Sequence, residues 1–193
     1  MINNRLIENA IKYCGILENP KNSNRGEVID TIQKEFGFEG IPYCVLFVLY
    51  IYKKTLEEFG IKLPLLVTPS SQTLFNWAQN KGLIETDFSK LGAGDIVIWR
   101  KFKLWQGHAG IVISVNHSEK SFLTVEGNTS AEHLLSICPA SCRVPSSENS
   151  DFGDQREGGG IFKRKRYMRK ADFAVDAFYL RGFIPADRII TKM

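Results

Sequence analysis

The sequence predicts an α+β domain in which N-terminal helices pack on a C-terminal antiparallel β-sheet. Two observations lead to this prediction. Residues 5–80 have the periodicity of amphipathic helices, whereas residues 95–185 change to β-branched and aromatic runs separated by polar turns. No internal repeat or linker divides the 193 residues, so we expect a single domain over residues 1–193.

The composition is that of an ordinary globular protein. Hydrophobic residues make up 44% of the chain and charged residues 24%, values that exclude disordered, collagen-like and coiled-coil chains. The longest apolar run, residues 43–52, is about half as long as a membrane-spanning helix, so no membrane span is expected. The four cysteines are too few and too unevenly spaced for a disulfide framework, and we interpret them as free thiols.

The net charge of +4 is unevenly distributed along the chain. Residues 156–170 hold seven basic side chains against one glutamate, so the rest of the chain is slightly acidic. This distribution argues against nucleic acid as a partner. Within the basic segment, the run from Lys163 to Arg166 would alternate between the two faces of a strand, and we interpret it as a solvated face.

Four helices are expected in the first half of the chain, over residues 5–13, 28–36, 43–59 and 72–80. A glycine follows each of the four, as is typical of helix ends. The segment 43–59 is apolar all round in its first half and amphipathic in its second half. This pattern predicts a helix whose N-terminal end lies in the core.

Five strands are expected in the second half. Residues 95–99, 109–115 and 121–127 are rich in β-branched and aromatic side chains, and the closing segment 160–185 holds two further runs, residues 162–168 and 176–185. Residues 139–160 are rich in Ser, Pro, Gly and charge, which predicts a long loop.

A polar turn joins two of these strands into a hairpin. Centred on Ser118, the hairpin places His108 opposite Asn128 and Gly110 opposite Glu126. His108, Glu126 and Asn128 then share one face, because side chains alternate along a strand. An imidazole within reach of a carboxylate and an amide is the arrangement of a general base and its orienting groups.

The same face carries two small residues, Gly110 and Ser114, which would let a neighbouring helix pack closely. Other interpretations of the hairpin residues remain open. An isolated histidine before a strand is more often a loop residue, and the Glu-Gly-Asn sequence at 126–128 is more often a turn.

Cys44 lies two residues after Pro42, at the expected first turn of the most hydrophobic helix. The unpaired amides and the dipole of a helix N-terminus stabilise a thiolate, so Cys44 is a candidate nucleophile. A cysteine in an apolar helix is more often a small core residue, and that interpretation also stays open.

Five short motifs follow one another between residues 24 and 128. They are Asn24-Arg25-Gly26, Pro42-Tyr43-Cys44 with the following Phe47, Gly94-Asp95-Ile96-Val97, Gly107-His108-Ala109-Gly110-Ile111-Val112 and Val125-Glu126-Gly127-Asn128. In this order they resemble the CHAP family, which comprises cysteine- and histidine-dependent amidohydrolases and peptidases with a papain-like fold. Members of that family typically cut peptidoglycan, either between muramic acid and L-Ala or within the stem and cross-bridge peptides.

The resemblance implies a role for each matching residue. Cys44 would be the nucleophile, His108 the base, Glu126 the orienting carboxylate and Asn128 a supporting residue. It implies neither a metal nor an organic cofactor. The position before the nucleophile is commonly Trp in such proteins and is Tyr43 here, a change that would reshape the mouth of the cleft.

Three further residues are candidates for contacting a substrate. They are Tyr43 beside the nucleophile, Asn24 in the first motif and Trp105 in the loop before His108. His133, Cys138 and Cys142 lack a convincing fourth ligand, so the sequence predicts no metal site.

The first functional hypothesis is a cysteine amidase or endopeptidase whose partner is bacterial peptidoglycan. The alternatives are a wall-binding or partner-binding module on the same fold and an amidase for another small amide conjugate. The first residues show no secretory signal. We therefore expect synthesis in the cytoplasm and action in the periplasm or cell wall after release or secretion. The source could be a phage lysin, a secreted antibacterial effector or a self-encoded wall-remodelling enzyme, and the missing signal favours the first two. An effector would have an immunity protein as a partner.

Overall fold

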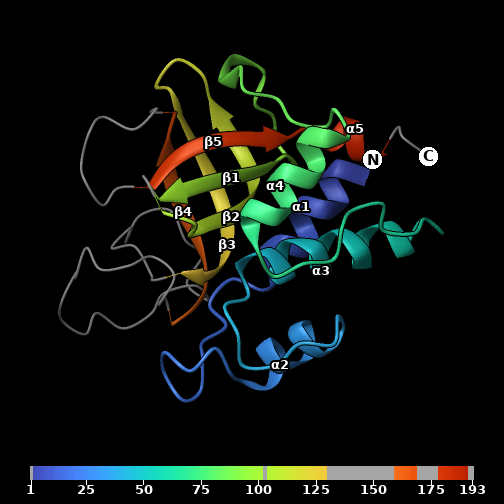
Figure 1. The fold of residues 1–193 in the computed structure, drawn as a ribbon, viewed down its shortest axis with the longest axis vertical. Helices are drawn as coiled ribbons and strands as arrows, with labels where there is room; N and C mark the ends of the chain where they lie inside the picture. Colours follow the sequence, from blue (N-terminus) through green and yellow to red (C-terminus); the bar gives the residue numbers. More distant parts are fainter. Residues whose placement is uncertain (1, 102–103, 130–158, 169–177, 191–193) are drawn as a thin grey trace.

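Helices pack beside one antiparallel sheet in this protein. The computed structural model describes residues 2–101, 104–129, 159–168 and 178–190. Figure 1 shows α1, α3 and α4 gathered beside the sheet, while α2 lies at the outer end of the molecule. The order of elements confirms the predicted α+β class, with helices first and strands second.

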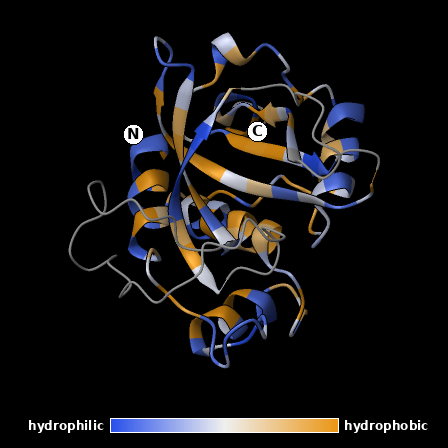
Figure 2. Cartoon of the chain, turned by 90° about the vertical axis from the view of Figure 1, so that its left-hand side faces the viewer, coloured by the Kyte–Doolittle hydropathy of each residue, from blue (hydrophilic) through white to orange (hydrophobic). Residues whose placement is uncertain are grey.

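Four α-helices lie in the first half of the chain, as predicted, namely α1 (Ile2–Lys12), α2 (Glu27–Lys34), α3 (Cys44–Glu57) and α4 (Ser71–Asn80). Helix α4 is capped by Ser70, whose side chain accepts a hydrogen bond from the Thr73 N–H. Figure 2 shows α1 banded in hydrophilic and hydrophobic colours, as an amphipathic helix requires. A 3₁₀-turn (Phe88–Lys90) and a short helix α5 (Ala186–Ile190) are further elements that the sequence pattern does not predict.

The sheet contains five strands in the order β4-β3-β2-β1-β5. Their bounds are β1 (Ile96–Lys101), β2 (Gly107–Asn116), β3 (Ser121–Thr129), β4 (Gly160–Tyr167) and β5 (Phe178–Ile184). All pairs are antiparallel. The last two strands of the chain, β4 and β5, form the two opposite edges of the sheet. The long loop that the sequence predicts over residues 139–160 lies outside the described residues as far as residue 158.

Alternating side chains divide the sheet into two apolar faces. One face packs against the helices through residues that include Ile96, Ile98 and Ile111. The other face carries a second cluster with Val97, Trp99, Val112, Phe122, Leu180 and Phe183. Both faces of the central strands are therefore buried, which agrees with their nearly continuous apolar sequence.

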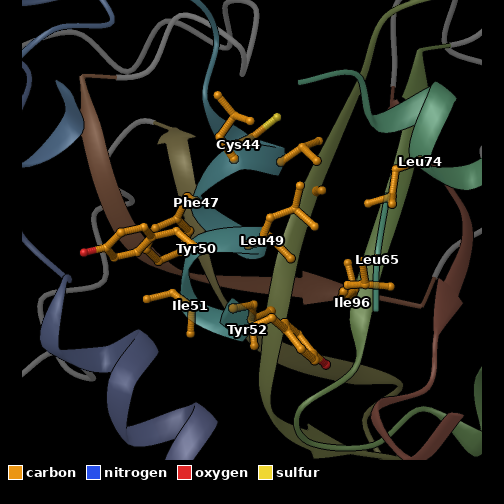
Figure 3. Close-up of a cluster of buried hydrophobic side chains, with 14 of the residues drawn as sticks. Cys44, Phe47, Leu49, Tyr50, Ile51, Tyr52, Leu65, Leu74 and Ile96 are labelled. Atoms are coloured by element: carbon orange, nitrogen blue, oxygen red, sulfur yellow. The ribbon is translucent and has the colours of Figure 1, made fainter. Parts of the chain in front are cut away.

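Helix α3 is the centre of the larger cluster. Its residues from Val45 to Leu49 are fully buried, and it packs on β2 and β3. Figure 3 shows side chains spreading from α3 toward Leu74 of α4 and Ile96 of β1. The prediction that the apolar end of this helix lies in the core is confirmed. Among the described residues, no helix is both long and apolar enough to cross a membrane.

The Gly94-Asp95 motif, just before β1, forms hydrogen bonds with residues of α3 and α5. The Tyr52 hydroxyl of α3 donates to the Gly94 carbonyl at 2.5 Å. The Asp95 carboxylate accepts from the N–H groups of Ala186 and Gly92 at 2.9 and 2.8 Å. Burial raises the pKa of Asp95 to about 6, although both of these hydrogen bonds lower it. This motif therefore connects α3, β1 and α5.

The β2–β3 hairpin has the predicted register only in the half that lies away from the turn. Ile111 lies opposite Val125 and Val112 opposite Thr124, as a hairpin centred on Ser118 requires. A bulge between Val112 and Ser114 then shifts the pairing by one residue toward the turn. The centre of the turn is therefore displaced, but His108 and Glu126 keep their predicted shared face, as the contact between their side chains shows.

Two glycines allow close contacts, though not the ones expected. A Cβ on Gly110 would lie 2.7 Å from Glu126 Cγ, so this glycine makes room for a carboxylate side chain rather than for a helix. The glycine that lets α3 approach is Gly127, where a Cβ would lie 2.8 Å from Phe47 Cβ and 3.1 Å from Tyr43 Cδ2. The expectation that Gly110 admits the helix is thus wrong, because Gly110 shares a face of β2 with His108 and Val112, on the side of the sheet away from the helices. The expectation for Ser114 stays a prediction, since the bulge changes the face on which Ser114 lies.

We expect Gly127→Ala to lower the free energy of unfolding by about 1–3 kcal/mol, the usual cost of adding a methyl group to a packed interior. Both close contacts of the added Cβ are on α3 or its N-cap, so the first turn of this helix must shift. Urea denaturation measures the change. Gly92→Ala is the matched control, since its Cβ would lie 3.8 Å from Asp95 Oδ2, an ordinary contact. Equal stability of both variants would contradict this account of the helix contact.

Candidate active site

Cys44 is the first residue of α3, at a helix end that has no side-chain cap. Tyr43 at the N-cap makes no side-chain capping hydrogen bond, and the first helical bond runs from the Phe47 N–H to the Tyr43 carbonyl at 2.8 Å. The N–H groups of Cys44 and its two successors therefore have no acceptor within the helix. Figure 3 shows the Cys44 side chain at this end of α3. Unpaired amides and the helix dipole favour an anion here.

His108 lies near the start of β2 and is almost completely buried, with 1% of its surface exposed. Its Nε2 atom lies 2.8 Å from Oε2 of Glu126. Nδ1 has no hydrogen-bond partner among the described residues. Burial would lower the pKa of His108, but the Glu126 carboxylate and the Cys44 thiol outweigh it and raise the pKa to about 9. One ring nitrogen is thus held by Glu126, and the other is left for the thiol.

Glu126 is completely buried, and its two oxygens are surrounded by donors. Oε1 accepts from the Thr124 hydroxyl at 2.6 Å and from Arg166 Nε at 2.8 Å. Oε2 accepts from Arg166 Nη2 at 2.5 Å and faces His108. Burial would raise the pKa of Glu126, but the charges of Arg166 and His108 outweigh it and hold the pKa well below its ordinary value. The carboxylate is therefore ionised at neutral pH.

Arg166 is the residue of this network that the sequence analysis missed. It belongs to the basic run of β4, which we interpreted as a solvated face, yet its side chain is only 13% exposed. Strand alternation turns Lys165 outward to Glu119 and Arg166 inward to Glu126. The side chains of β4 alternate as predicted, but the face of β4 that carries Arg166 is turned toward Glu126 and not toward solvent. Recognising Arg166 would have required knowing that β4 pairs with β3, the strand that carries Glu126.

Asn128 lies close to the site but does not hold the imidazole. It occupies a positive-φ conformation (φ 53°) within a bulge of β3. Its side chain is 1% exposed, and neither its oxygen nor its nitrogen has a hydrogen-bond partner among the described residues. The side chain that contacts the His108 ring is that of Glu126. The supporting role predicted for Asn128 therefore rests on no hydrogen bond among the described residues.

Tyr43, the residue before Cys44, is completely buried. Burial raises the pKa of Tyr43, the nearby Glu18 carboxylate raises it further, and the Asn128 backbone N–H lowers it. The ring therefore has no exposed surface with which to contact a substrate. This position corrects the expectation that Tyr43 is a substrate contact.

The two other expected substrate contacts lie in loops. Asn24 is half-buried, and its backbone N–H donates to Glu18 Oε2 at 3.0 Å while its carbonyl accepts from Gln33 at 2.6 Å. Trp105 lies between β1 and β2 and is 75% exposed, the largest exposed fraction among the large hydrophobic side chains described. The backbone of Asn24 thus stabilises its loop through two hydrogen bonds. The Trp105 ring, in contrast, is exposed to solvent.

Metal ligation has no basis in the part of the chain that is described. No group of three or more His, Cys, Asp or Glu side chains there could hold a metal ion. The weak candidates His133, Cys138 and Cys142 lie outside the described residues. The chemistry available in the described site is that of a thiol beside an imidazole, with a carboxylate that orients the ring.

Comparison with known proteins agrees with this geometry. The family model of the CHAP domain matches residues 36–128, a segment that begins shortly before Cys44 and ends at Asn128. Asn24 lies outside the matched segment. A search of curated proteins finds no match. The family resemblance predicted from the motifs is thereby confirmed over residues 36–128, the segment that contains Cys44, His108 and Glu126.

Proposed function

We propose that this protein is a cysteine-dependent hydrolase that cleaves an amide bond in bacterial peptidoglycan. The CHAP domain implies amidase or peptidase activity of the peptidoglycan hydrolase type in general. The observation that carries the proposal for particular residues is the state of His108, whose Nε2 is held by Glu126 and whose Nδ1 has no other partner among the described residues. A histidine held in this way is suited to exchange a proton with Cys44.

In the proposed reaction, His108 takes the proton of the Cys44 thiol, and the thiolate attacks the carbonyl carbon of the amide. The unpaired N–H groups at the start of α3 are suited to stabilise the negative oxygen of the tetrahedral intermediate. His108 then gives its proton to the leaving amine as the C–N bond breaks. Water, deprotonated by His108, hydrolyses the thioester and returns the thiol. Glu126 keeps the ring oriented and stabilises its cationic form.

The scissile bond belongs to one of two classes in this proposal. It is either the amide between muramic acid and L-Ala or an amide within the stem or cross-bridge peptide. The exposed ring of Trp105 is suited to stack on such a substrate, since aromatic faces bind apolar and saccharide surfaces. The reaction would take place in the periplasm or cell wall, after release or secretion of the protein.

The test of the proposed function is digestion of purified peptidoglycan, with the new termini identified by mass spectrometry. We expect free amino groups at one defined amide bond and no new reducing sugar ends. Free reducing ends would indicate a glycosidase instead. Binding to the wall without any new terminus would indicate a binding module on the same fold, and turnover of small amide conjugates alone would indicate a different amidase.

We expect Cys44→Ala and Cys44→Ser to abolish hydrolysis while the protein stays folded. The thiol supplies the nucleophile but little packing volume, so the free energy of unfolding should change by far less than the about 2–5 kcal/mol of a large core truncation. Product release from peptidoglycan and urea denaturation measure the two effects. Cys14→Ala, which removes a half-buried thiol far from α3 in the sequence, is the control. Substantial activity of Cys44→Ala would show that the nucleophile lies elsewhere.

Alkylation distinguishes an activated thiol from an accessible one. Cys14 is half-buried, whereas Cys44 is only 5% exposed, so accessibility alone would favour Cys14. At a pH of about 6, most ordinary thiols are protonated and unreactive, since their pKa is about 8.5. We expect iodoacetamide to label Cys44 before Cys14, Cys138 and Cys142, as peptide mass spectrometry would show. Earlier labelling of Cys14 would support the interpretation of Cys44 as a core residue.

The pH dependence tests the contact between His108 and Glu126. The Glu126 charge contributes to the raised pKa of His108, about 9, so the wild-type imidazolium persists through neutral pH. Glu126→Gln removes this charge, and we expect the pKa of His108 to fall by about one unit or more. The alkaline limb of kcat/KM should move to lower pH by the same amount. An unchanged His108 titration by NMR, with normal activity, would show that the two groups are not coupled.

A further inference from the structure

We infer that Arg166 is a positioning residue of this site, and that its guanidinium fixes the Glu126 carboxylate in the orientation that holds His108. The inference rests on the proposed function, because it concerns the group that orients the base. Arg166 itself touches neither the thiol nor the imidazole in any described hydrogen bond. It acts through Glu126.

The first support is the geometry of the pair. Arg166 reaches both carboxylate oxygens, with Nε 2.8 Å from Oε1 and Nη2 2.5 Å from Oε2. Two parallel N–H donors match the two oxygens of a carboxylate, a fit that lysine cannot reproduce. The carboxylate therefore cannot rotate away from His108 without breaking two charge-assisted hydrogen bonds.

The second support is the aromatic layer that fixes the guanidinium. Its carbon lies 5.2 Å from the centre of the Trp99 ring. The same ring lies beside the imidazole, with the centroids of Trp99 and His108 5.7 Å apart. One indole of β1 thus borders both the arginine and the histidine. A cation over an indole face is attracted by the ring electrons, which adds to the two hydrogen bonds.

The third support is the balance of charge in the buried network. Glu126 is fully buried, and the side chain of Arg166 is 13% exposed. When the thiolate and imidazolium form, the four groups of Cys44, His108, Glu126 and Arg166 carry no net charge. Without Arg166, the imidazolium alone would compensate the carboxylate. His108 would then hold its proton more tightly and give it less readily to a leaving amine.

The groups around Glu126 come from several elements. His108 faces it from β2 and the Thr124 hydroxyl from β3, while Cys44 at the start of α3 acts on it through His108. Arg164 has its Cα opposite Thr124 and so lies on the same face of β4 as Arg166. Arg166 is the residue of β4 whose guanidinium donates two hydrogen bonds to the Glu126 carboxylate.

The experiment compares Arg166→Gln and Arg166→Lys with Glu126→Gln. Lys165→Gln is the matched control, because Lys165 precedes Arg166 on β4 but pairs with Glu119 on the other face. Three quantities are measured for each protein. They are the steady-state kinetics on peptidoglycan against pH, which give kcat and kcat/KM, the NMR titration of His108, and the pH dependence of iodoacetamide labelling of Cys44.

For Arg166→Gln we expect kcat/KM to fall by about tenfold or more, as when other supporting groups of a site are removed. The pKa of His108 should rise by about one unit, because both its repulsion from the guanidinium and the neutralisation of Glu126 are lost. This direction is opposite to that expected for Glu126→Gln. Arg166→Lys keeps the charge, so the His108 titration should stay near that of the wild type while kcat falls. Lys165→Gln should match the wild type in all three measurements.

Two results would overturn the inference. One is an unchanged His108 titration in Arg166→Gln, whatever its stability, since that would leave Arg166 with only a structural role between β3 and β4. The other is wild-type kcat in Arg166→Lys, which decides the question if Arg166→Gln does not fold. The titration and the labelling need no turnover, so an inactive wild-type protein would refute the proposed function while these measurements still tested Arg166.

Discussion

A fully buried carboxylate is stable only where donors and cations surround it, and in this protein three strands meet that requirement for Glu126. Thr124 of β3 and Arg166 of β4 supply hydrogen bonds, and His108 of β2 supplies a second positive charge. Removing one partner from a buried pair leaves an uncompensated charge, so the parts of such a network depend on one another. The orientation of His108 and the packing of β4 on β3 are therefore parts of the same arrangement.

The second constraint is the approach of α3 to the sheet. The first half of the helix is apolar and buried, so packing holds this half against the sheet, and the Tyr52 hydrogen bond to Gly94 holds the helix further along. Gly127 allows its first turn to lie against β3, directly beside Glu126 in the sequence. Gly110 in turn leaves room for the Glu126 side chain. Gly110 and Gly127 are thus explained by steric fit, whereas the proposed function assigns the chemistry to His108 and Glu126 of the same two motifs.

Much of this site was predictable because it depends on local pattern. The position of Cys44 follows from the start of an apolar helix after Pro42, and the shared face of His108 and Glu126 follows from strand alternation. The bulge after Val112 could not be foreseen, since it depends on how β2 and β3 twist against their neighbours. The expectation for Gly110 failed for a related reason. Alternation tells which residues share a face, but not which element covers that face.

The sequence by itself determined the fold class, the order of helices and strands, and the residues of the thiol, imidazole and carboxylate. These depend on periodicity and on contacts between neighbouring strands of a hairpin, which are close in the chain. Tertiary structure alone decided that Arg166 belongs to the same network, that Tyr43 is buried and that Trp105 is exposed. Arg166 and Glu126 are forty positions apart, and the register that brings them together is set by the packing of whole strands. Sequence periodicity identifies the inward face of a strand but carries no information about its partner across such a distance.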